Sequence, residues 1–370
     1  MKRFFYKINC FLKFLWDTHQ ESGKSLVFLL KDFIYLKKKK KIRIEEYRDF
    51  EFEKQGPEFR ETFLTALEQH PCLDLLNPKK YYILARNKYL SHLLLEACGI
   101  RKAELYCYYN PEGRIKNDHI AYDYDSVLEI LKLKNVHSCV IKGTETSHGD
   151  GVLVVDNIEY METECVLHLF NGEKFYLRNK LKEYEPLIFE SKIHQTDQFN
   201  SFNSSSVNTV RFMTTLHPLG EAKIIAIWMK FGKPGVCVDN AGAGGNIDAA
   251  VDIKTGKIYN VTLFDGWRRT QSITHHPNNK ILLEGVLIEN WDKITREILQ
   301  FQKSVPYLKA IGWDIAITPE GPLVVEFNDY WDRTGQLFIK KGWKKEIESC
   351  YEEWKYLERE GKVSYKMGRL

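Results

Sequence analysis

Residues 312–329 read GWDIAITPEGPLVVEFND, and this stretch is the strongest structural signal in the chain. It contains two apolar runs, 313–318 and 323–327, which have the composition of β-strands. A Pro-Glu-Gly-Pro segment separates the two runs, and proline and glycine in such a segment favour a reversal of the chain. The stretch therefore predicts a β-hairpin.

Three oxygen-bearing side chains interrupt the apolar runs of this hairpin. Asp314 lies on the first run, whereas Glu326 and Asn328 lie two residues apart on the second and so face the same side of a strand. The hairpin can bring Asp314 alongside them. Two carboxylates and an amide oxygen form a hard donor set that suits Mg2+, which also takes phosphates and water. The alternative interpretation is an amphipathic hairpin whose acids are only solvated.

The composition is that of a soluble globular protein. The chain has 370 residues, which is enough for two or three domains. No apolar run approaches the roughly 18–20 residues that span a bilayer. The eight cysteines include no C-x-x-C pair, so we expect neither a zinc site nor a disulfide framework. Reduced thiols in a cytoplasm fit this pattern.

Positive charge is concentrated at the N-terminus. Residues 1–48 contain 13 Lys and Arg against 5 Asp and Glu, a net charge of +8, whereas the whole chain carries +4. The remainder of the chain is therefore mildly acidic. A protein body that binds nucleic acid would carry a basic stripe across its fold, so we expect no nucleic-acid partner.

The basic N-terminal arm has an apolar face. The residues that recur there at helical spacing are Phe4, Phe5, Ile8, Phe11, Leu12, Leu15 and Trp16. One interpretation is a helix that docks on the protein body through this aromatic face. The other is an amphipathic helix that lies on an anionic membrane surface, assisted by the lysines at 37–41.

Residues 45–100 have helical periodicity. We expect the pattern at 59–70 to end at Pro71 and the pattern at 88–97 to end at Gly99. Lys88 falls in the first turn of the second helix, where a lysine is ordinarily solvated surface.

From residue 136 the pattern changes to short strands. Strands at 139–142 and 152–156 flank the loop GTETSHGDG, whose backbone N–H groups could fold over phosphates. Lys142 could reach the same phosphates as a point charge, although an ordinary hairpin gives the same pattern. Residues 186–197 form another strand that leads into a linker. The backbone of such a linker can pair with an adenine edge, and acids a few residues later can reach ribose hydroxyls.

Two further strands, 207–216 and 223–231, carry Arg211 and Lys230. An arginine buried in a strand needs an anion, which is either a structural carboxylate or a phosphoryl group in transfer. A second glycine cluster, DNAGAGGNI, follows at 239–247 and is too irregular for a strand.

Together these segments resemble the ATP-grasp superfamily, and more closely the ATP-grasp proteins associated with sugar-transfer and capsule genes, which are relatives of the glutamate ligases. The resemblance covers roughly residues 78–335. The strings that carry it are NKYLSHLLLEACGI, VIKGTETSHGDGVLVV, LIFESKIHQTD, VNTVRFMTTL, VDNAGAGGNIDAAVD and GWDIAITPEGPLVVEFN.

The resemblance implies an α+β protein with the ATP-grasp fold, in which two α+β subdomains grip ATP, preceded by a helical N-terminal region. The expected parts are a basic arm at 1–50, a helical region at 51–135, a small subdomain at 136–195, a large metal-bearing subdomain at 196–335 and a C-terminal helical segment at 336–370.

The resemblance also implies roles for individual residues. Lys88 and Lys142 would contact the ATP phosphates, and the loop 144–151, with Ser147, Gly149 and Gly151, would cover them. Glu190, Ser191 and Ile193 would form the adenine hinge. Asp197 would bind the ribose. The catalytic set is Arg211, Lys230 and Asn240. Arg211 and Lys230 match basic residues near the γ-phosphate and the developing acyl phosphate, and Asn240 matches, with Gly244 and Gly245, a glycine turn that faces the acceptor. The Mg2+ ligands are Asp314, Glu326 and Asn328.

Two positions depart from the family pattern. Ser191 stands where many relatives have an acid or a lysine, so only its backbone contact transfers. Gly143 follows Lys142 where proline is frequent. Neither change removes a required charge.

The implied activity is an ATP-dependent carboxylate–amine ligase that uses Mg2+, or alternatively Mn2+, and forms an acyl phosphate. It would attach an amino acid to a sugar or polysaccharide precursor. A kinase of the same fold, acting on a sugar or lipid hydroxyl, is an alternative, as is a non-catalytic nucleotide-binding partner of glycosyltransferases. The expected partners are small-molecule or glycan carboxylates and amines, and glycosyltransferases. The expected location is the cytoplasm, with peripheral contact at the inner face of the membrane.

Overall fold

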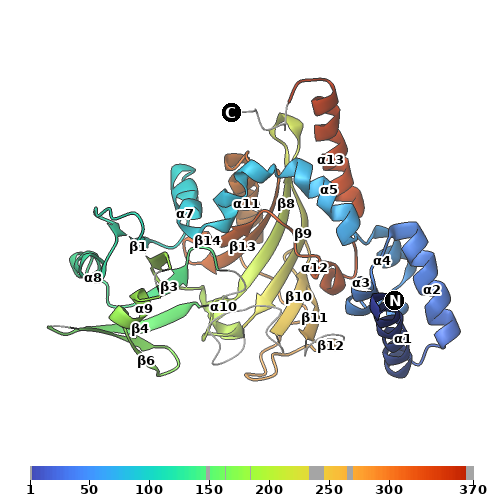
Figure 1. Ribbon diagram of the computed structural model, residues 1–370, viewed down its shortest axis with the longest axis horizontal. Coiled ribbons are helices and arrows are strands. Elements are labelled where there is room, and N and C mark those ends of the chain that lie inside the picture. The colour runs from blue at the N-terminus through green and yellow to red at the C-terminus, as the bar shows by residue number, and fades with distance from the viewer. Residues whose placement is uncertain are drawn as a thin grey trace.

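The computed structural model describes residues 2–146, 151–162, 164–183, 185–232, 246–264 and 270–363. Within these residues the strands form two seven-stranded sheets. Figure 1 shows the smaller assembly on the left, the larger sheet in the centre and the N-terminal helices on the right. The protein is thus an α+β chain with a helical N-terminal region, as predicted.

The small sheet has the strand order β2-β1-β7-β3-β4-β5-β6. Helices α8 (Tyr124–Leu133) and α9 (Leu177–Leu181) bury apolar residues against it. Its strands are β1 (Leu105–Tyr109), β2 (Ile120–Ala121), β3 (Cys139–Gly143), β4 (Leu153–Tyr160), β5 (Cys165–Leu169), β6 (Lys174–Tyr176) and β7 (Leu187–Glu190). The first two strands come from a segment that we expected to be helical. The sequence of β1, LYCYY, is rich in tyrosine, which favours a strand.

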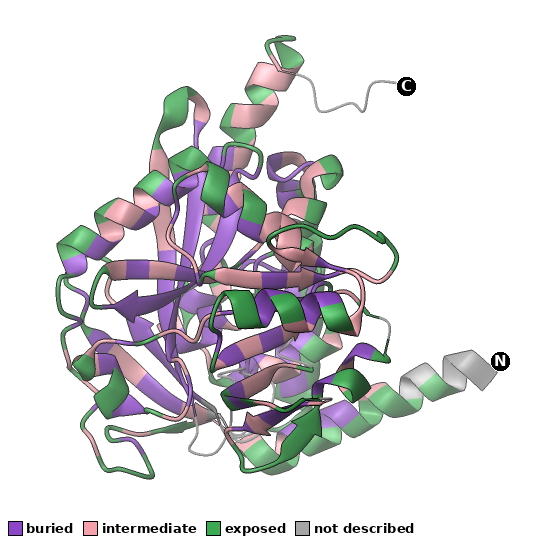
Figure 2. Ribbon diagram, turned by 90° about the vertical axis from the view of Figure 1, so that its left-hand side faces the viewer, coloured by how far each residue is buried: buried purple, intermediate pink, exposed green. Residues whose placement is uncertain are grey.

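The large sheet has the order β12-β11-β10-β9-β8-β13-β14, and its neighbouring strands are antiparallel. Its strands are β8 (Thr209–Leu216), β9 (Ala222–Phe231), β10 (Asn246–Val251), β11 (Ile258–Phe264), β12 (Thr270–Ser272), β13 (Ala310–Thr318) and β14 (Gly321–Asn328). The hairpin predicted at 312–329 is β13 and β14. Figure 2 shows that these strands are mostly buried, because helices cover both faces.

One face of the large sheet packs against α11 (Trp291–Ser304), whose Ile294 and Ile298 are buried in that core. The other face packs against helices from both ends of the chain. Trp228 of β9 stacks on Trp343 with ring centroids 6.0 Å apart. The helices of this second layer include α3 (Ile44–Asp49), α4 (Pro57–Thr62), α5 (Ala66–Leu76), α12 (Gly335–Ile339) and α13 (Lys344–Arg359).

The N-terminal arm forms α1 (Lys2–Ser22) and α2 (Leu26–Lys40). Phe14 of α1 and Phe33 of α2 pack on Tyr47 at centroid distances of 5.6 and 5.7 Å. Burial of each such side chain contributes roughly 1.5–3 kcal/mol, so the arm is docked on the body. The side chains of Phe4, Phe5 and Ile8 lie outside the described part of the structure. No helix among the described residues is long and apolar enough to cross a bilayer.

The helix pattern around Pro71 differs from our expectation. The predicted helix at 59–70 is divided at Thr65, whose hydroxyl accepts a hydrogen bond from the backbone N–H of Glu68 at 3.3 Å. Helix α5 then continues through Pro71 to Leu76. A proline in a helix leaves the carbonyl four residues earlier without its donor. Here that residue is Leu67, which is exposed, so water can satisfy the group.

Two short helices complete the approach to the site. These are α6 (Ile83–Arg86) and α7 (Lys88–Ala97), the second with the bounds that the sequence predicts. Asn87 caps α7, because its side chain accepts a hydrogen bond from the backbone N–H of Leu90 at 3.1 Å.

Candidate active site

A cavity of about 980 Å³ lies where the two sheets meet. Its walls include α6, α7, β3, β7, β9 and β14. A second cavity of about 460 Å³ adjoins it. The two share lining residues, and most of these are polar: Lys88, Lys142, Thr146, Glu190, Ile193, Lys230, Val325 and Glu326. Residues from widely separated parts of the chain therefore border one continuous space.

The floor of the cavity is organised around Asp314. The strand register places Asp314 opposite Glu326 on β14 and opposite Arg211 on β8. Arg211 donates from Nε and Nη2 to the two carboxylate oxygens of Asp314, both at 2.5 Å. Lys230 Nζ lies 3.2 Å from Oδ1 of the same carboxylate. Burial alone would raise the pKa of Asp314, but Arg211 and Lys230 hold it below its ordinary value.

Glu326 has the opposite electrostatic setting. Its carboxylate is accessible to solvent through the cavity, yet protein surrounds it on most sides. Burial and the adjacent Asp314 raise the pKa of Glu326 above its ordinary value. Arg211 and Lys230 oppose this shift without cancelling it.

This donor set fits a divalent cation. A cation beside Glu326 would favour its ionised form, and carboxylate and amide oxygens are the ligands that Mg2+ prefers. Asn328 lies two residues further along β14, and its Nδ2 donates to the carbonyl oxygen of Gly312 at 3.4 Å. That contact uses the amide nitrogen and leaves Oδ1 for another partner. Asp314 is already engaged by two basic side chains, so Glu326 and Asn328 are the more available ligands.

A buried ion pair forms the opposite wall. Lys142 on β3 forms an ion pair with Oε1 of Glu190 at the end of β7. His92 Nε2 of α7 lies 2.9 Å from the other oxygen, Oε2. Burial opposes ionisation of Glu190, but Lys142 and His92 outweigh it and lower the pKa of Glu190 to about 2. Glu190 is therefore a fixed negative charge that orients Lys142.

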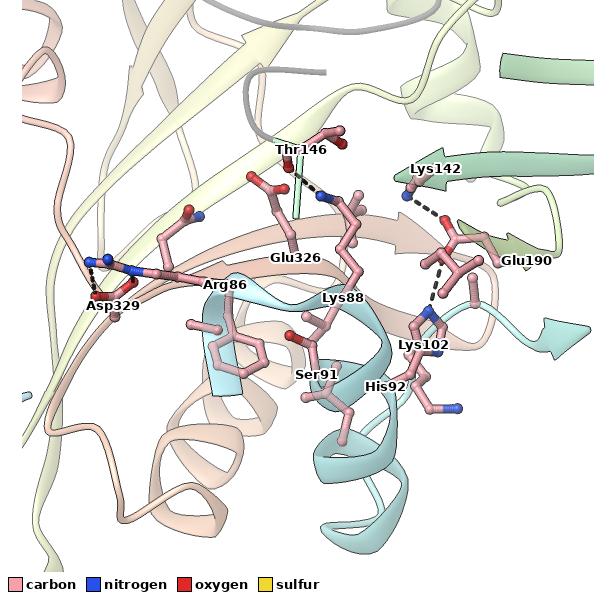
Figure 3. A pocket seen from close by; sticks show the side chains of 18 of the residues that line it. Arg86, Lys88, Ser91, His92, Lys102, Lys142, Thr146, Glu190, Glu326 and Asp329 are labelled. Carbon is pink, nitrogen blue, oxygen red and sulfur yellow. Dashed lines mark hydrogen bonds and ion pairs between the residues drawn. The ribbon is translucent and has the colours of Figure 1, made fainter. Parts of the chain in front are cut away.

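Lys88 projects between these two groups from the start of α7 (Figure 3). Its backbone N–H donates to the carbonyl oxygen of Thr144 at 2.8 Å, and its ammonium group donates to the carbonyl oxygen of Thr146. Burial lowers the pKa of Lys88; the Glu326 carboxylate opposes this shift, and Lys142 adds to it. Lys88 is thus held at the mouth of the loop that follows β3.

The predicted adenine hinge consists of Glu190, Ser191 and Ile193. The backbone N–H of Ser191 donates to the carbonyl oxygen of Glu104 at 2.9 Å, and its hydroxyl accepts from the Glu104 N–H at 3.0 Å. Ser191 and Ile193 line the smaller cavity. Asp197 is exposed at the start of α10 (Asp197–Phe202) and does not line either cavity. The structure therefore brings the hinge to the cavity but leaves the predicted ribose acid apart from it.

Several predicted residues fall beyond what the structure describes. Gly151 is described; it is exposed, has a positive φ of 71° and lines neither cavity. The predictions outside the described residues are Ser147, Gly149, Asn240, Gly244 and Gly245.

Two features of the cavity wall were not predicted. One is His92, which is buried; its spacing of four residues from Lys88 on one helix was the available signal. The other is the pair formed by Arg86 and Asp329, with nitrogen–oxygen distances of 3.1 and 2.9 Å. Asp329 directly follows the predicted ligand Asn328, but its partner lies more than 240 residues away in sequence, so only the folded chain shows the pairing.

The sequence profile of a family described as "Sugar-transfer associated ATP-grasp" matches residues 70–351. This chain belongs to the sugar-transfer-associated ATP-grasp family. The match covers the two sheets and the cavity between them. No curated protein shows significant sequence similarity to the chain.

Solved structures with a related arrangement are distant in sequence. The VanG D-Ala:D-Ser ligase from Enterococcus faecalis is 10% identical, with a TM-score of 0.42 over 73% of this chain and 62% of that ligase. A D-alanine–D-alanine ligase from Bacillus anthracis is 11% identical, with a TM-score of 0.39 over 75% of this chain and 69% of that ligase. The N5-carboxyaminoimidazole ribonucleotide synthetase from Thermotoga maritima is 12% identical, with a TM-score of 0.39 over 75% of this chain and 52% of that synthetase. The chain thus spans less than two thirds of the first and about half of the third.

Proposed function

We propose that this family member is an ATP-dependent carboxylate–amine ligase that modifies a sugar-containing precursor. The observation that carries the proposal is the convergence of Lys88, Lys142 and Lys230 on the space bordered by Glu326. Cations that surround a cavity suit the phosphates of a nucleotide, and adjacent oxygen donors suit the metal ion that accompanies it.

The residues of this chain act by positioning and by charge. In the proposed reaction a substrate carboxylate oxygen attacks the γ-phosphorus of ATP, the bond to the bridging oxygen breaks, and ADP leaves. An amine then attacks the carbonyl carbon, and phosphate leaves as the amide forms. Lys142 and Lys88 would hold the phosphates, while Lys230 and Arg211 would stabilise the negative charge that develops during transfer.

A divalent cation fits beside Glu326 and Asn328, as the donor set indicates, with Asp314 as the third ligand. When bound, it would neutralise phosphate charge and orient the transferred group. The Arg211–Asp314 ion pair adds a constraint from the protein itself. Because Asp314 is fixed by two hydrogen bonds from one guanidinium group, its position does not depend on the ligand.

The family description supports a sugar-linked substrate. The larger cavity has room for such a group beside the lysines, and its lining includes additional polar side chains at Arg86, Ser91, Lys102 and Asp332. These groups could hydrogen-bond hydroxyl or carboxylate oxygens of an acceptor.

Product analysis tests the proposal. With ATP, Mg2+, a panel of sugar carboxylates and hydroxylamine, a ligase should release ADP and free phosphate and yield a hydroxamate, because hydroxylamine intercepts the activated acyl group. The kinase alternative predicts ADP without free phosphate and one phosphate retained on a sugar or lipid hydroxyl. That second result would overturn the ligase proposal.

A further inference from the structure

Helix α2 has two apolar faces, but the protein covers only one. Leu29, Phe33 and Leu36 are buried against the body. The remaining apolar side chains are between 38% and 63% exposed; these are Leu26, Val27, Phe28, Leu30, Ile34 and Tyr35. A surface helix of a soluble domain ordinarily carries polar residues opposite its buried stripe. The outer face of α2 departs from that pattern.

The exposed surface of α2 is also positively charged. The six exposed lysines on and beside α2 are Lys24, Lys31, Lys37, Lys38, Lys39 and Lys41. The structure records no ion pair between these lysines and a carboxylate in the part of the chain that it describes. The only acidic residue of α2 is Asp32, and it is turned toward the body. Arg60 donates to both Asp32 oxygens at 2.7 Å, and the Tyr47 hydroxyl donates to Oδ2 at 2.7 Å.

Apolar and basic residues alternate along one outward stripe of the helix. Val27, Lys31, Ile34 and Lys38 follow one another at spacings of four, three and four residues, which places them on the same side. Figure 1 shows α2 at the outer edge of the molecule, on the side away from the small sheet. The stripe therefore lies on the outside of the molecule, where a large partner can reach it.

We propose that this outer face of α2 docks on an anionic phospholipid bilayer. Lysine can extend its ammonium group to lipid phosphates while its aliphatic stem lies among the acyl chains, so interleaved lysines do not interrupt apolar burial. An acidic protein would satisfy the lysines but would need a matching groove for six apolar side chains. A bilayer surface satisfies both features without such a groove. The buried residues of α1 and α2 pack on the body and so orient the outer face of α2 in the absence of a membrane.

Vesicle flotation with the full chain tests this inference. The wild-type protein should float with vesicles of phosphatidylcholine and phosphatidylglycerol, and much less with phosphatidylcholine alone. The substitutions Lys31→Gln, Lys38→Gln and Lys39→Gln together should weaken partitioning roughly 100-fold, because each basic residue near an anionic surface strengthens binding about fivefold. A rise from about 0.15 to 1 M salt should release the wild type, since the Debye length falls from about 8 to 3 Å.

Two matched variants complete the experiment. Lys254→Gln, Lys293→Gln and Lys303→Gln change three exposed lysines elsewhere and should leave partitioning unchanged. Val27→Ser with Ile34→Ser keeps every charge and should weaken binding at least tenfold, since two apolar side chains no longer enter the bilayer. Equal flotation with neutral and anionic vesicles, equal losses in both lysine triples, or no flotation of the wild type would each overturn the proposal.

Discussion

The lysines of the cavity and the lysines of α2 show the same side chain in two opposite settings. Lys142 is paired with the buried Glu190, Lys230 lies against Asp314, and Lys88 is held by the carbonyl oxygen of Thr146. On α2, Lys31 and Lys38 are exposed, and neither forms an ion pair with a carboxylate of the described residues. The first set converges on one cavity, whereas the second is spread along a helix.

This difference separates two kinds of anion. Converging, pre-positioned cations suit a compact anion such as a nucleotide phosphate chain, because their positions are fixed before binding. Dispersed cations along a helix cannot enclose a small anion, but they can act together on an extended surface. The lysines of the cavity differ from those of α2 because protein groups fix their positions. The small net charge of the chain, +4, does not reveal this difference.

We expect the largest effect on turnover from a change to the Glu326 carboxylate. Glu326→Gln removes the charge that a divalent cation would neutralise but little volume, so we expect turnover to fall about 10³-fold with the fold retained. Metal-dependent turnover and thermal unfolding measure the two effects. Glu320→Gln in the exposed turn is the matched control. Wild-type turnover in Glu326→Gln would remove the metal assignment.

Arg211→Met tests whether the floor of the cavity is preorganised. Loss of the guanidinium group leaves the buried Asp314 with Lys230 as its remaining cation. The free energy of unfolding should therefore fall by about 3–5 kcal/mol. Turnover should fall more than ATP affinity, because a contact to developing charge strengthens in the transition state. Denaturant unfolding, kcat and nucleotide titration separate these effects. Arg211→Lys keeps the charge without the paired hydrogen bonds and should recover part of the stability; an unchanged stability of Arg211→Met would contradict the account.

His92→Ala tests a smaller contribution to the same cavity. It removes one hydrogen bond to the buried Glu190, which should lower stability by about 1–3 kcal/mol and raise KM for ATP with little change in kcat. His92→Gln retains a nitrogen donor and should partly restore both values. The effect of His92→Ala on KM should shrink in a Glu190→Gln background, since the shared carboxylate is then neutral. Equal effects in both backgrounds would show that His92 acts by another route.

The pH dependence of stability tests the buried charge of Glu190 itself. The pKa of Glu190 is about 2 in the folded protein and has an ordinary value of 4.5, so its ionisation stabilises the fold above pH 4.5. This contribution is lost as the pH falls toward 2. The melting temperature of Glu190→Gln should therefore lie below that of the wild type at pH 7, and the difference should narrow in acid. A constant difference from pH 7 to pH 3 would contradict the assignment.

Local sequence signals predicted the elements that depend on local chemistry. The bounds of α7 follow from Asn87 as its cap and from Gly99 shortly after its end. The β13–β14 hairpin follows from two apolar runs and a Pro-Glu-Gly-Pro turn, and its register places Asp314 beside Glu326. The glycine-rich loop after Lys142 already suggested a phosphate contact for that residue, whereas only the family resemblance gave Lys88 such a role.

The remaining features depend on which distant elements meet. His92 contacts Glu190 across 98 residues, and Arg211 contacts Asp314 across 103. Neither pairing has a signature in the local sequence. The sequence also left open whether the arm docks on the body or binds a membrane. The structure docks it through Phe14 and Phe33, while the outer face of α2 stays uncovered.

A nucleotide titration of three proteins tests the central claim most directly. The account predicts that Lys142→Ala weakens ATP–Mg2+ binding about 10–100-fold, because a charge-assisted contact to phosphate contributes roughly 1.5–3 kcal/mol. It predicts wild-type affinity for the variant with Lys31, Lys38 and Lys39 changed to glutamine, since these side chains lie on a separate, outer surface. Unchanged affinity in Lys142→Ala, or an equal loss in the α2 variant, would contradict the assignment of the cavity as the nucleotide site.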